Sequence, residues 1–184
     1  MFLHLISQKN RRLAAYISDI NTELINAYVA VKDSVEQLIT LLTQHEIEYN
    51  KAPEEYYYKL RDNYNPTDNK ERAARFIAPN RTCFNGLYRV NRNGSFNVPW
   101  GKYKNPSICD SDNLRNASYL LRNCNVTIKA ADYKDILLQN AKEGDFIYLD
   151  PPYSPVSSTA YFTSYTDNGF QIRNKRSLLK HTNN

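Results

Sequence analysis

Long apolar runs are missing from this sequence of 184 residues. Its most apolar segments, such as Leu38 to Leu42, are short and have polar flanks, whereas a membrane-spanning helix needs about 20 apolar residues in succession. The N-terminus also has neither the apolar run nor the small-residue cleavage site of a secretory signal peptide. We therefore expect a soluble, cytoplasmic protein without a membrane partner.

Cysteine is scarce, and patterns of metal ligands are lacking. Cys83, Cys109 and Cys124 are widely spaced, form no Cys-x-x-Cys pair and have no histidine nearby. Disulfide frameworks and structural zinc sites both depend on closely patterned cysteine and histidine residues. The sequence therefore predicts three free thiols and no bound metal.

Acidic residues are absent from Arg72 to Cys109, although the formal net charge of the whole chain is only +5. Cations, rings and amides alternate in this stretch: Arg72, Arg75, Arg81, Arg89, Arg92, Lys102, Lys104, Phe76, Phe84, Tyr88, Phe96, Trp100, Tyr103, Asn80, Asn85, Asn91, Asn93, Asn97 and Asn105. Arginine and lysine bind phosphates, asparagine and arginine read base edges, and aromatic faces stack on bases. The stretch therefore predicts a nucleic-acid surface; the alternative is a solvated basic loop.

The N-terminal part of the chain has the pattern of a strand followed by a helix. The run from Leu13 to Ser18 predicts a strand with Asp19 at its carboxyl end. Asn21 or Thr22 is suited to cap a helix, because apolar residues at helical spacing follow.

A second helix is expected to start at Asp33, with Glu36 as its reciprocal capping partner. Pro53 should mark its end. Its buried face should consist of Val35, Leu38, Ile39 and Leu42.

The remaining segments predict short helices, loops and two more strands. Short helices should occupy residues 51–71, and residues 80–106 should form loops with a hairpin around residues 92–94. Residues 126–130 and 146–149 read as strands, and the uninterrupted apolarity of the second suits a parallel strand covered on both faces. The fold class is therefore α/β, an open sheet interrupted by a basic recognition module.

Asp150, Pro151, Pro152 and Tyr153 follow the last predicted strand directly, which is where open α/β sheets bind ligands. The amino group of adenine is a poor nucleophile toward a methyl group unless it donates hydrogen bonds to nearby acceptors. The Asp150 carboxylate and the Pro151 carbonyl can be those acceptors, and Tyr153 can stack on a base swung out of the duplex. The alternative is a plain loop. No Pro-Cys nucleophile occurs in the sequence, which agrees with direct transfer to nitrogen.

Two long motifs, "YLDPPYSP…TAYFTSYT…GF" and "NRTCFNGLYRVNRNGSFNVPWGKYKNP", resemble the Dam-type, class D12, DNA adenine methyltransferases. The resemblance spans roughly residues 2–170. It implies an incomplete Rossmann-like sheet that binds S-adenosylmethionine, with an inserted, mainly helical target-recognition region containing a β-hairpin. The implied reaction is methylation of adenine N6 in double-stranded DNA by a monomer, with GATC as the favoured target. Related motifs also serve cytosine N4 or, with Asn for Asp, amide nitrogens, but Asp150 and the recognition stretch favour adenine.

The resemblance also implies roles for individual residues. Asp19 would hold the ribose hydroxyls of S-adenosylmethionine, Asp132 and Tyr133 would contact its adenine, and Asp150 would border both cofactor and target base. Arg89 would read a guanine, with Leu87, Pro99 and Tyr103 at neighbouring base edges. The remaining DNA contacts would be Phe84 inserted into the base stack, Asn85 at the unpaired base, and Asn91, Asn97 and Lys102 at phosphates. The alternatives are that Phe84 and Leu87 are core residues and that Asn91 and Asn97 are turn residues.

The sequence departs from the family pattern at both ends. The glycine-rich loop expected before "FLHL" is absent, and the basic tail "QIRNKRSLLKHTNN" replaces an acidic helix. We therefore expect a chain truncated at both ends, through a frameshift on the C-terminal side, that binds the cofactor weakly. Its expected parts are a partial catalytic domain in residues 1–50 and 111–184, and a target-recognition region in residues 51–110. The alternative function is an inactive remnant that only binds DNA; restriction protection, phage defence evasion and regulation remain open as roles.

Overall fold

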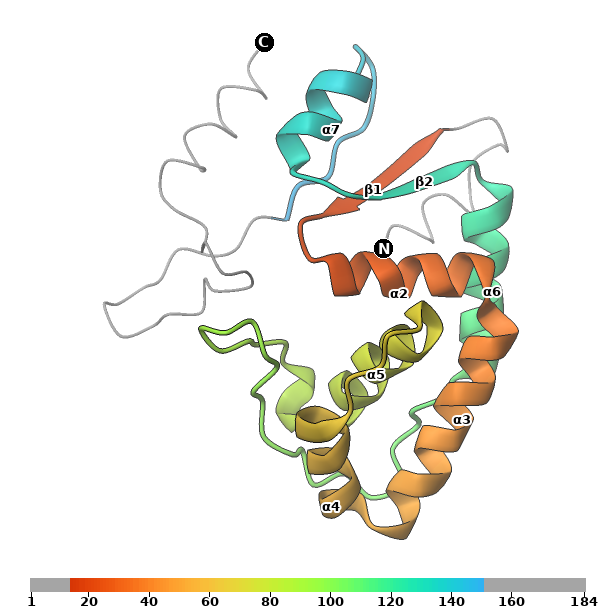
Figure 1. The fold of residues 1–184 in the computed structure, drawn as a ribbon. Helices are drawn as coiled ribbons and strands as arrows, with labels where there is room; N and C mark the ends of the chain where they lie inside the picture. Colours follow the sequence, from red (N-terminus) through yellow and green to blue (C-terminus); the bar gives the residue numbers. More distant parts are fainter. Residues whose placement is uncertain (1–13, 151–184) are drawn as a thin grey trace. The chain divides into compact units, whose positions relative to one another are not determined.

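The computed structural model describes residues 14–150, which divide into two compact units. Residues 14–87 and 99–140 belong to the first unit, and residues 88–98 and 141–150 belong to the second. Figure 1 shows the elements of the first unit, a pair of strands and helices on either side of it.

Two parallel strands form the sheet of the first unit. β1 (Ala15–Asp19) pairs with β2 (Val126–Ala130) in a register that places Ala15 opposite Val126 and Asp19 opposite Ala130. The strands at residues 13–18 and 126–130 were thus predicted correctly to within two residues. Several helices lie between β1 and β2 in the sequence, which confirms a mixed α/β chain with an insertion between two paired strands.

Helices cover both faces of the two strands. α2 (Thr22–Asp33) begins after Asn21, whose side chain accepts hydrogen bonds from the backbone N–H groups of Glu23 and Leu24 at 3.1 and 3.2 Å. This is the predicted cap. α7 (Tyr133–Asn140) follows β2, and Figure 1 shows it on the face of the strands opposite to α2. The Lys32 ammonium also joins α2 to β2 by donating to the Val126 carbonyl at 2.7 Å.

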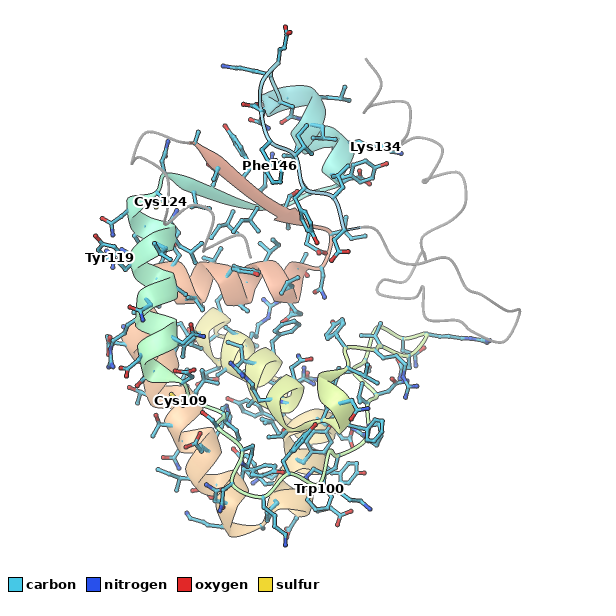
Figure 2. All side chains as sticks on the ribbon, turned by 180° about the vertical axis from the view of Figure 1, so that it is seen from behind. Trp100, Cys109, Tyr119, Cys124, Lys134 and Phe146 are labelled. Atoms are coloured by element: carbon cyan, nitrogen blue, oxygen red, sulfur yellow. The ribbon has the colours of Figure 1, made fainter. Side chains whose placement is uncertain are left out.

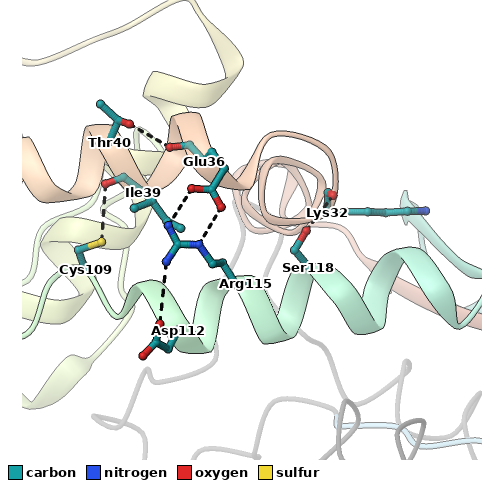
Figure 3. A network of polar contacts seen from close by, with 8 residues as sticks. All are labelled: Lys32, Glu36, Ile39, Thr40, Cys109, Asp112, Arg115 and Ser118. Carbon is teal, nitrogen blue, oxygen red and sulfur yellow. Dashed lines mark hydrogen bonds and ion pairs between the residues drawn. The ribbon is translucent and has the colours of Figure 1, made fainter.

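The predicted capping pair of Asp33 and Glu36 is wrong. α3 (Val35–Lys51) starts after Ser34, and Asp33 is the last residue of α2. One residue, Ser34, separates the two helices. Its carbonyl accepts from the Leu38 N–H, and its N–H donates to the Ala30 carbonyl, so Asp33 does not occupy the N-cap position that a capping box requires. Glu36 instead forms a bidentate ion pair with Arg115, both contacts 2.8 Å long (Figure 3).

α3 lies against α6 (Ser111–Asn123), and its buried face agrees largely with the prediction. Leu38, Ile39 and Leu42 are buried, whereas Val35 is half-buried. The Cys109 thiol donates to the Ile39 carbonyl at 3.6 Å, and the Ser118 hydroxyl donates to the Lys32 carbonyl at 3.2 Å (Figure 3).

The region after α3 is helical, as predicted for residues 51–71. It contains α4 (Pro53–Tyr58), a π-helical turn (Lys59–Asn63) and α5 (Asn69–Thr82). α5 runs beyond the predicted start of the loops at residue 80, and it does so although Pro79 lies inside it. In this last turn the Asn80 side chain donates to the Phe76 carbonyl at 2.7 Å, and the Thr82 hydroxyl donates to the Ala78 carbonyl at 2.8 Å.

The second unit contains the predicted hairpin. Val90 and Phe96 form an antiparallel bridge, and Asn91 donates its N–H to the Ser95 carbonyl at 2.8 Å. Gly94 closes the turn with a φ of +75°, a backbone conformation that glycine adopts without strain.

The predicted strand at residues 146–149 is wrong. These residues form no strand, and the side chains of Phe146 and Tyr148 are 79% and 60% exposed. An apolar run indicates that burying its residues is favourable, but it does not show which strand they would pair with. The sheet within residues 14–150 consists of β1 and β2.

Other expectations concern cysteines, metals and membranes. All three cysteines have free thiols. Residues 14–150 contain no group of three or more side chains arranged to hold a metal ion. Among the helices in that range, none combines the length and apolarity that crossing a membrane requires.

Candidate functional site

Asp19 and Asp132 lie at the carboxyl ends of neighbouring parallel strands. Asp19 is the last residue of β1, and its backbone carbonyl accepts from the Ala131 N–H at 3.1 Å, directly before Asp132. The Asp19 carboxylate accepts from the Asn21 N–H at 2.7 Å, and the Asp132 carboxylate accepts from the Lys134 N–H at 2.9 Å. Each carboxylate thus accepts a backbone hydrogen bond through its Oδ1 atom.

This edge of the sheet has hydrogen-bond acceptors of the kind that bind a nucleoside. Carboxylates accept hydrogen bonds from ribose hydroxyls and exocyclic amino groups, and the carboxyl edge of parallel strands is the usual ligand position in open α/β folds. Tyr133, the first residue of α7, adds a half-buried aromatic ring with the Lys134 ammonium 5.8 Å from its centroid. Figure 2 shows Lys134 on α7. The residues present therefore fit the ribose and adenine parts of S-adenosylmethionine.

Asp150 is exposed and is the last residue that the structure describes. It belongs to the second unit. Pro151, Pro152 and Tyr153 lie outside the described residues. Their predicted roles, and that of Asp150, remain predictions.

A short 3-10 turn, Phe84–Gly86, presents two of the predicted DNA-binding residues at the end of α5. Phe84 is 50% exposed and Leu87 is 42% exposed, which excludes the alternative that they are core residues. Asn85 has a φ of +53°, a left-handed conformation that asparagine adopts more readily than most residues. The turn is joined to the segment that begins at Pro99, because the Phe84 N–H donates to the Pro99 carbonyl at 2.9 Å.

Residues 99–103 run beside this turn. Cys83 and Trp100 form an antiparallel bridge, and the Gly101 N–H donates to the Thr82 carbonyl at 2.9 Å. Lys102 is exposed with a φ of +59°, and Tyr103 is 40% exposed. A pocket of about 450 Å³ opens here, lined by Asn50, Pro53, Trp100, Lys102, Tyr103, Lys104 and Asn105.

The hairpin of the second unit carries Arg89, Asn91 and Asn97. The Arg89 guanidinium donates through Nε to the Asn97 side-chain oxygen at 2.8 Å and through Nη2 to the Asn97 backbone oxygen at 3.2 Å. The Asn91 side chain accepts from the backbone N–H groups of Asn93 and Ser95 at 2.9 and 3.0 Å. Asn91 is therefore a turn residue, although its amide nitrogen can still donate to a phosphate.

The predicted DNA-binding residues divide into two groups. Phe84, Asn85, Leu87, Pro99, Lys102 and Tyr103 are together in the first unit, and Arg89, Asn91 and Asn97 are together in the hairpin. The sequence interpretation missed Asn50, which lines the pocket from the end of α3. No local signal points to it, because about fifty positions separate it from Trp100 and Lys102, which line the same pocket.

Comparisons of the sequence with known proteins show which family it matches. The profile of a family described as D12 class N6 adenine-specific DNA methyltransferase matches residues 4–184. The chain is 44% identical over 180 residues to Type II methyltransferase M1.LlaDCHI of Lactococcus lactis subsp. cremoris, covering 95% of this chain and 60% of the relative. It is 42% identical over 186 residues to Type II methyltransferase M.MjaIII of Methanocaldococcus jannaschii, covering 97% and 63%. It is 39% identical over 170 residues to a DNA adenine methylase of Serratia marcescens, covering 89% and 60%. The chain thus spans about 60% of the length of these curated relatives.

Proposed function

Because the chain belongs to the D12 class of N6 adenine-specific DNA methyltransferases, we propose that it acts in methyl transfer from S-adenosylmethionine to adenine N6 in double-stranded DNA. We propose GATC as the target and a monomer as the active form. The observation that carries the proposal is the pair of carboxylates, Asp19 and Asp132, at adjacent carboxyl ends of parallel strands. Family members use S-adenosylmethionine, and these residues fit its nucleoside part.

The proposal divides the chain into catalytic and recognition parts. Residues 1–50 and 111–184 would form part of a Rossmann-like sheet, which the parallel pairing of β1 with β2 supports. Residues 51–110 would form the target-recognition region, and the short helices and the hairpin found there support this assignment.

Each proposed site residue has a defined chemical task. Asp19 accepts hydrogen bonds from the ribose hydroxyls, and Asp132 and Tyr133 contact the adenine ring of the cofactor. When bound, S-adenosylmethionine supplies an electrophilic methyl group. The Asp150 carboxylate and the Pro151 carbonyl would each accept a hydrogen bond from the target amino group, which raises the electron density on its nitrogen. Tyr153 stacks on the flipped base.

Recognition of DNA is proposed for the two groups of exposed residues. Phe84 inserts into the base stack and Asn85 meets the unpaired base, while Leu87, Pro99 and Tyr103 lie at base edges. Arg89 reads a guanine, with its guanidinium held by Asn97. Asn91, Asn97 and Lys102 contact phosphates.

Replacement of Asp19 by asparagine should weaken S-adenosylmethionine binding by about ten-fold to one-hundred-fold, because it removes charge-assisted hydrogen bonds. Calorimetry measures the change, in the chain completed with the remaining segments of the Lactococcus relative. Asp112→Asn is the matched control, since the Asp112 side chain is 92% exposed on α6. Equal affinities of the Asp19→Asn variant and the parent would contradict the assignment.

Asn97 is proposed both to hold the Arg89 guanidinium and to contact phosphate, and two substitutions separate these roles. Asn97→Ala removes the acceptor for Arg89 and the amide donor, so it should reduce both the discrimination at one base pair and the overall affinity. Asn97→Asp keeps the acceptor but adds a negative charge, so it should preserve discrimination within about two-fold while weakening binding to all sequences. Binding titrations with duplexes that differ in one base pair distinguish these effects. Loss of discrimination in the Asn97→Asp variant would show that Asn97 does not orient Arg89.

DNA binding without methyl transfer is the second candidate function. The observation that favours it is that Phe84, Leu87, Lys102 and Tyr103, in the basic and aromatic stretch, are exposed. Calorimetry with S-adenosylmethionine on the unextended chain separates the two candidates: a heat of binding supports the enzyme, and its absence together with DNA binding supports the second candidate.

A further inference from the structure

Tyr49 connects α3 to the recognition segment of residues 99–103 by two hydrogen bonds. Its side chain is only 1% exposed. The Tyr49 hydroxyl accepts from the Trp100 indole N–H at 2.8 Å and donates to the Tyr103 backbone carbonyl at 3.0 Å. Figure 2 shows Trp100 among the side chains of the helical region.

On its other side the segment is held by two backbone hydrogen bonds, from the Phe84 N–H to the Pro99 carbonyl and from the Gly101 N–H to the Thr82 carbonyl. Apart from the bridge at Trp100 it has no regular secondary structure, and Lys102 has a left-handed φ of +59°. Gly101 packs closely against Cys83, because a Cβ at this position would lie 2.5 Å from the Cys83 carbonyl oxygen and would also clash with the Tyr103 ring. The segment is therefore held between the end of α5 on one side and the Tyr49 hydroxyl on the other.

We propose that Tyr49 is a positioning residue for target recognition, because its hydroxyl holds residues 99–103 in the conformation that presents Lys102 and Tyr103 to DNA. This inference rests on the proposed function, since it assumes that these exposed residues meet DNA. Tyr49 itself does not touch the DNA.

The chemistry of the hydroxyl suits this role. Burial raises the pKa of Tyr49, so the hydroxyl keeps its proton and remains the donor to Tyr103 at physiological pH. Phenylalanine has the same ring and lacks this donor and acceptor. The Tyr49→Phe substitution therefore leaves the Trp100 N–H and the Tyr103 carbonyl without their shared partner, with little change in packing volume.

Tyr56→Phe provides a matched control. The Tyr56 hydroxyl forms a hydrogen bond of 2.7 Å with Nδ1 of His45 in the same helical region. Both substitutions remove one phenolic oxygen from a half-buried or buried site, but only Tyr49 contacts residues 99–103. A purely structural effect of losing a buried hydroxyl should appear in both variants.

The experiment measures binding of the full 184-residue chain to a GATC duplex and to duplexes with one altered base pair, by fluorescence anisotropy at fixed salt. The Tyr49→Phe variant should lose about three-fold to ten-fold in the ratio of cognate to altered affinities. The Tyr56→Phe variant should keep the parent ratio. Thermal unfolding of both variants shows whether their stabilities are comparable.

Three results would overturn the proposal. An unchanged ratio in the Tyr49→Phe variant, with the parent chain discriminating normally, refutes the positioning role alone. An equal loss in the Tyr56→Phe variant shows a general structural effect. A parent chain without discrimination refutes target recognition by this chain, and the positioning role with it. If Tyr49→Phe does not fold, Trp100→Phe breaks the same hydroxyl contact from the other side, and the same loss is expected there.

Discussion

Replacement of Asp150 by alanine should abolish methyl transfer and leave DNA affinity within a few-fold. The carboxylate is proposed to accept a hydrogen bond from the amino group of the flipped adenine, so its loss affects the reaction and not the binding of the duplex. A tritium-transfer assay on unmethylated GATC duplexes measures the first effect, and anisotropy measures the second. Both use the chain completed with the remaining segments of a relative.

Asp145→Ala is the control for this experiment. Asp145 is also exposed, lies five residues earlier, and accepts from the Lys142 N–H at 2.8 Å in a turn. Its loss should leave methyl transfer close to that of the parent. Full activity in the Asp150→Ala variant would remove Asp150 from the catalytic site.

Arg89 and Lys102 should respond differently to alanine. Arg89→Ala should cost about 1 to 3 kcal/mol at one base pair and relax sequence preference there, because a guanidinium that donates two hydrogen bonds to guanine loses its specific partner. Lys102→Ala should weaken binding to all sequences alike and lower the salt slope by about one, because it removes one phosphate contact. Salt titrations with cognate and altered duplexes measure both quantities.

The hairpin geometry strengthens the prediction for Arg89. Its Nε and Nη2 groups are engaged with Asn97, which orients the guanidinium while other N–H groups can still donate to a base. Equal, sequence-independent losses from both substitutions would show that Arg89 contacts phosphate. A change of salt slope for Arg89 without loss of discrimination would lead to the same conclusion.

Local elements of the fold were predictable because local rules determine them. The strand ending at Asp19 and the helix cap at Asn21 depend on neighbours within four residues, and the structure confirms both. The capping pair at Asp33 failed because α2 and α3 almost merge. The loop start at residue 80 failed because Asn80 and Thr82 bond back to the preceding turn.

The candidate site was predictable only as a set of residue types and family motifs. The exposure of Phe84 and Leu87 agrees with surface roles, which the sequence left open. The hydrogen bond from the Arg89 guanidinium to the Asn97 side chain was not predicted, although the two residues are only eight positions apart. A hairpin pattern shows that two segments pair, but it does not show which side-chain atoms meet across the turn.

The sequence by itself determined the family, through the order of its two long motifs, and the types of its elements, through apolar spacing and helix caps. The tertiary structure decided which distant residues meet. It placed Asp19 beside the strand that leads to Asp132, and it brought the Tyr49 hydroxyl to Trp100 and Tyr103. These contacts join residues about fifty to more than one hundred positions apart, so no local propensity encodes them. They arise when helices and strands bury their apolar faces together, and the polar groups of the site then take the positions that this packing leaves to them.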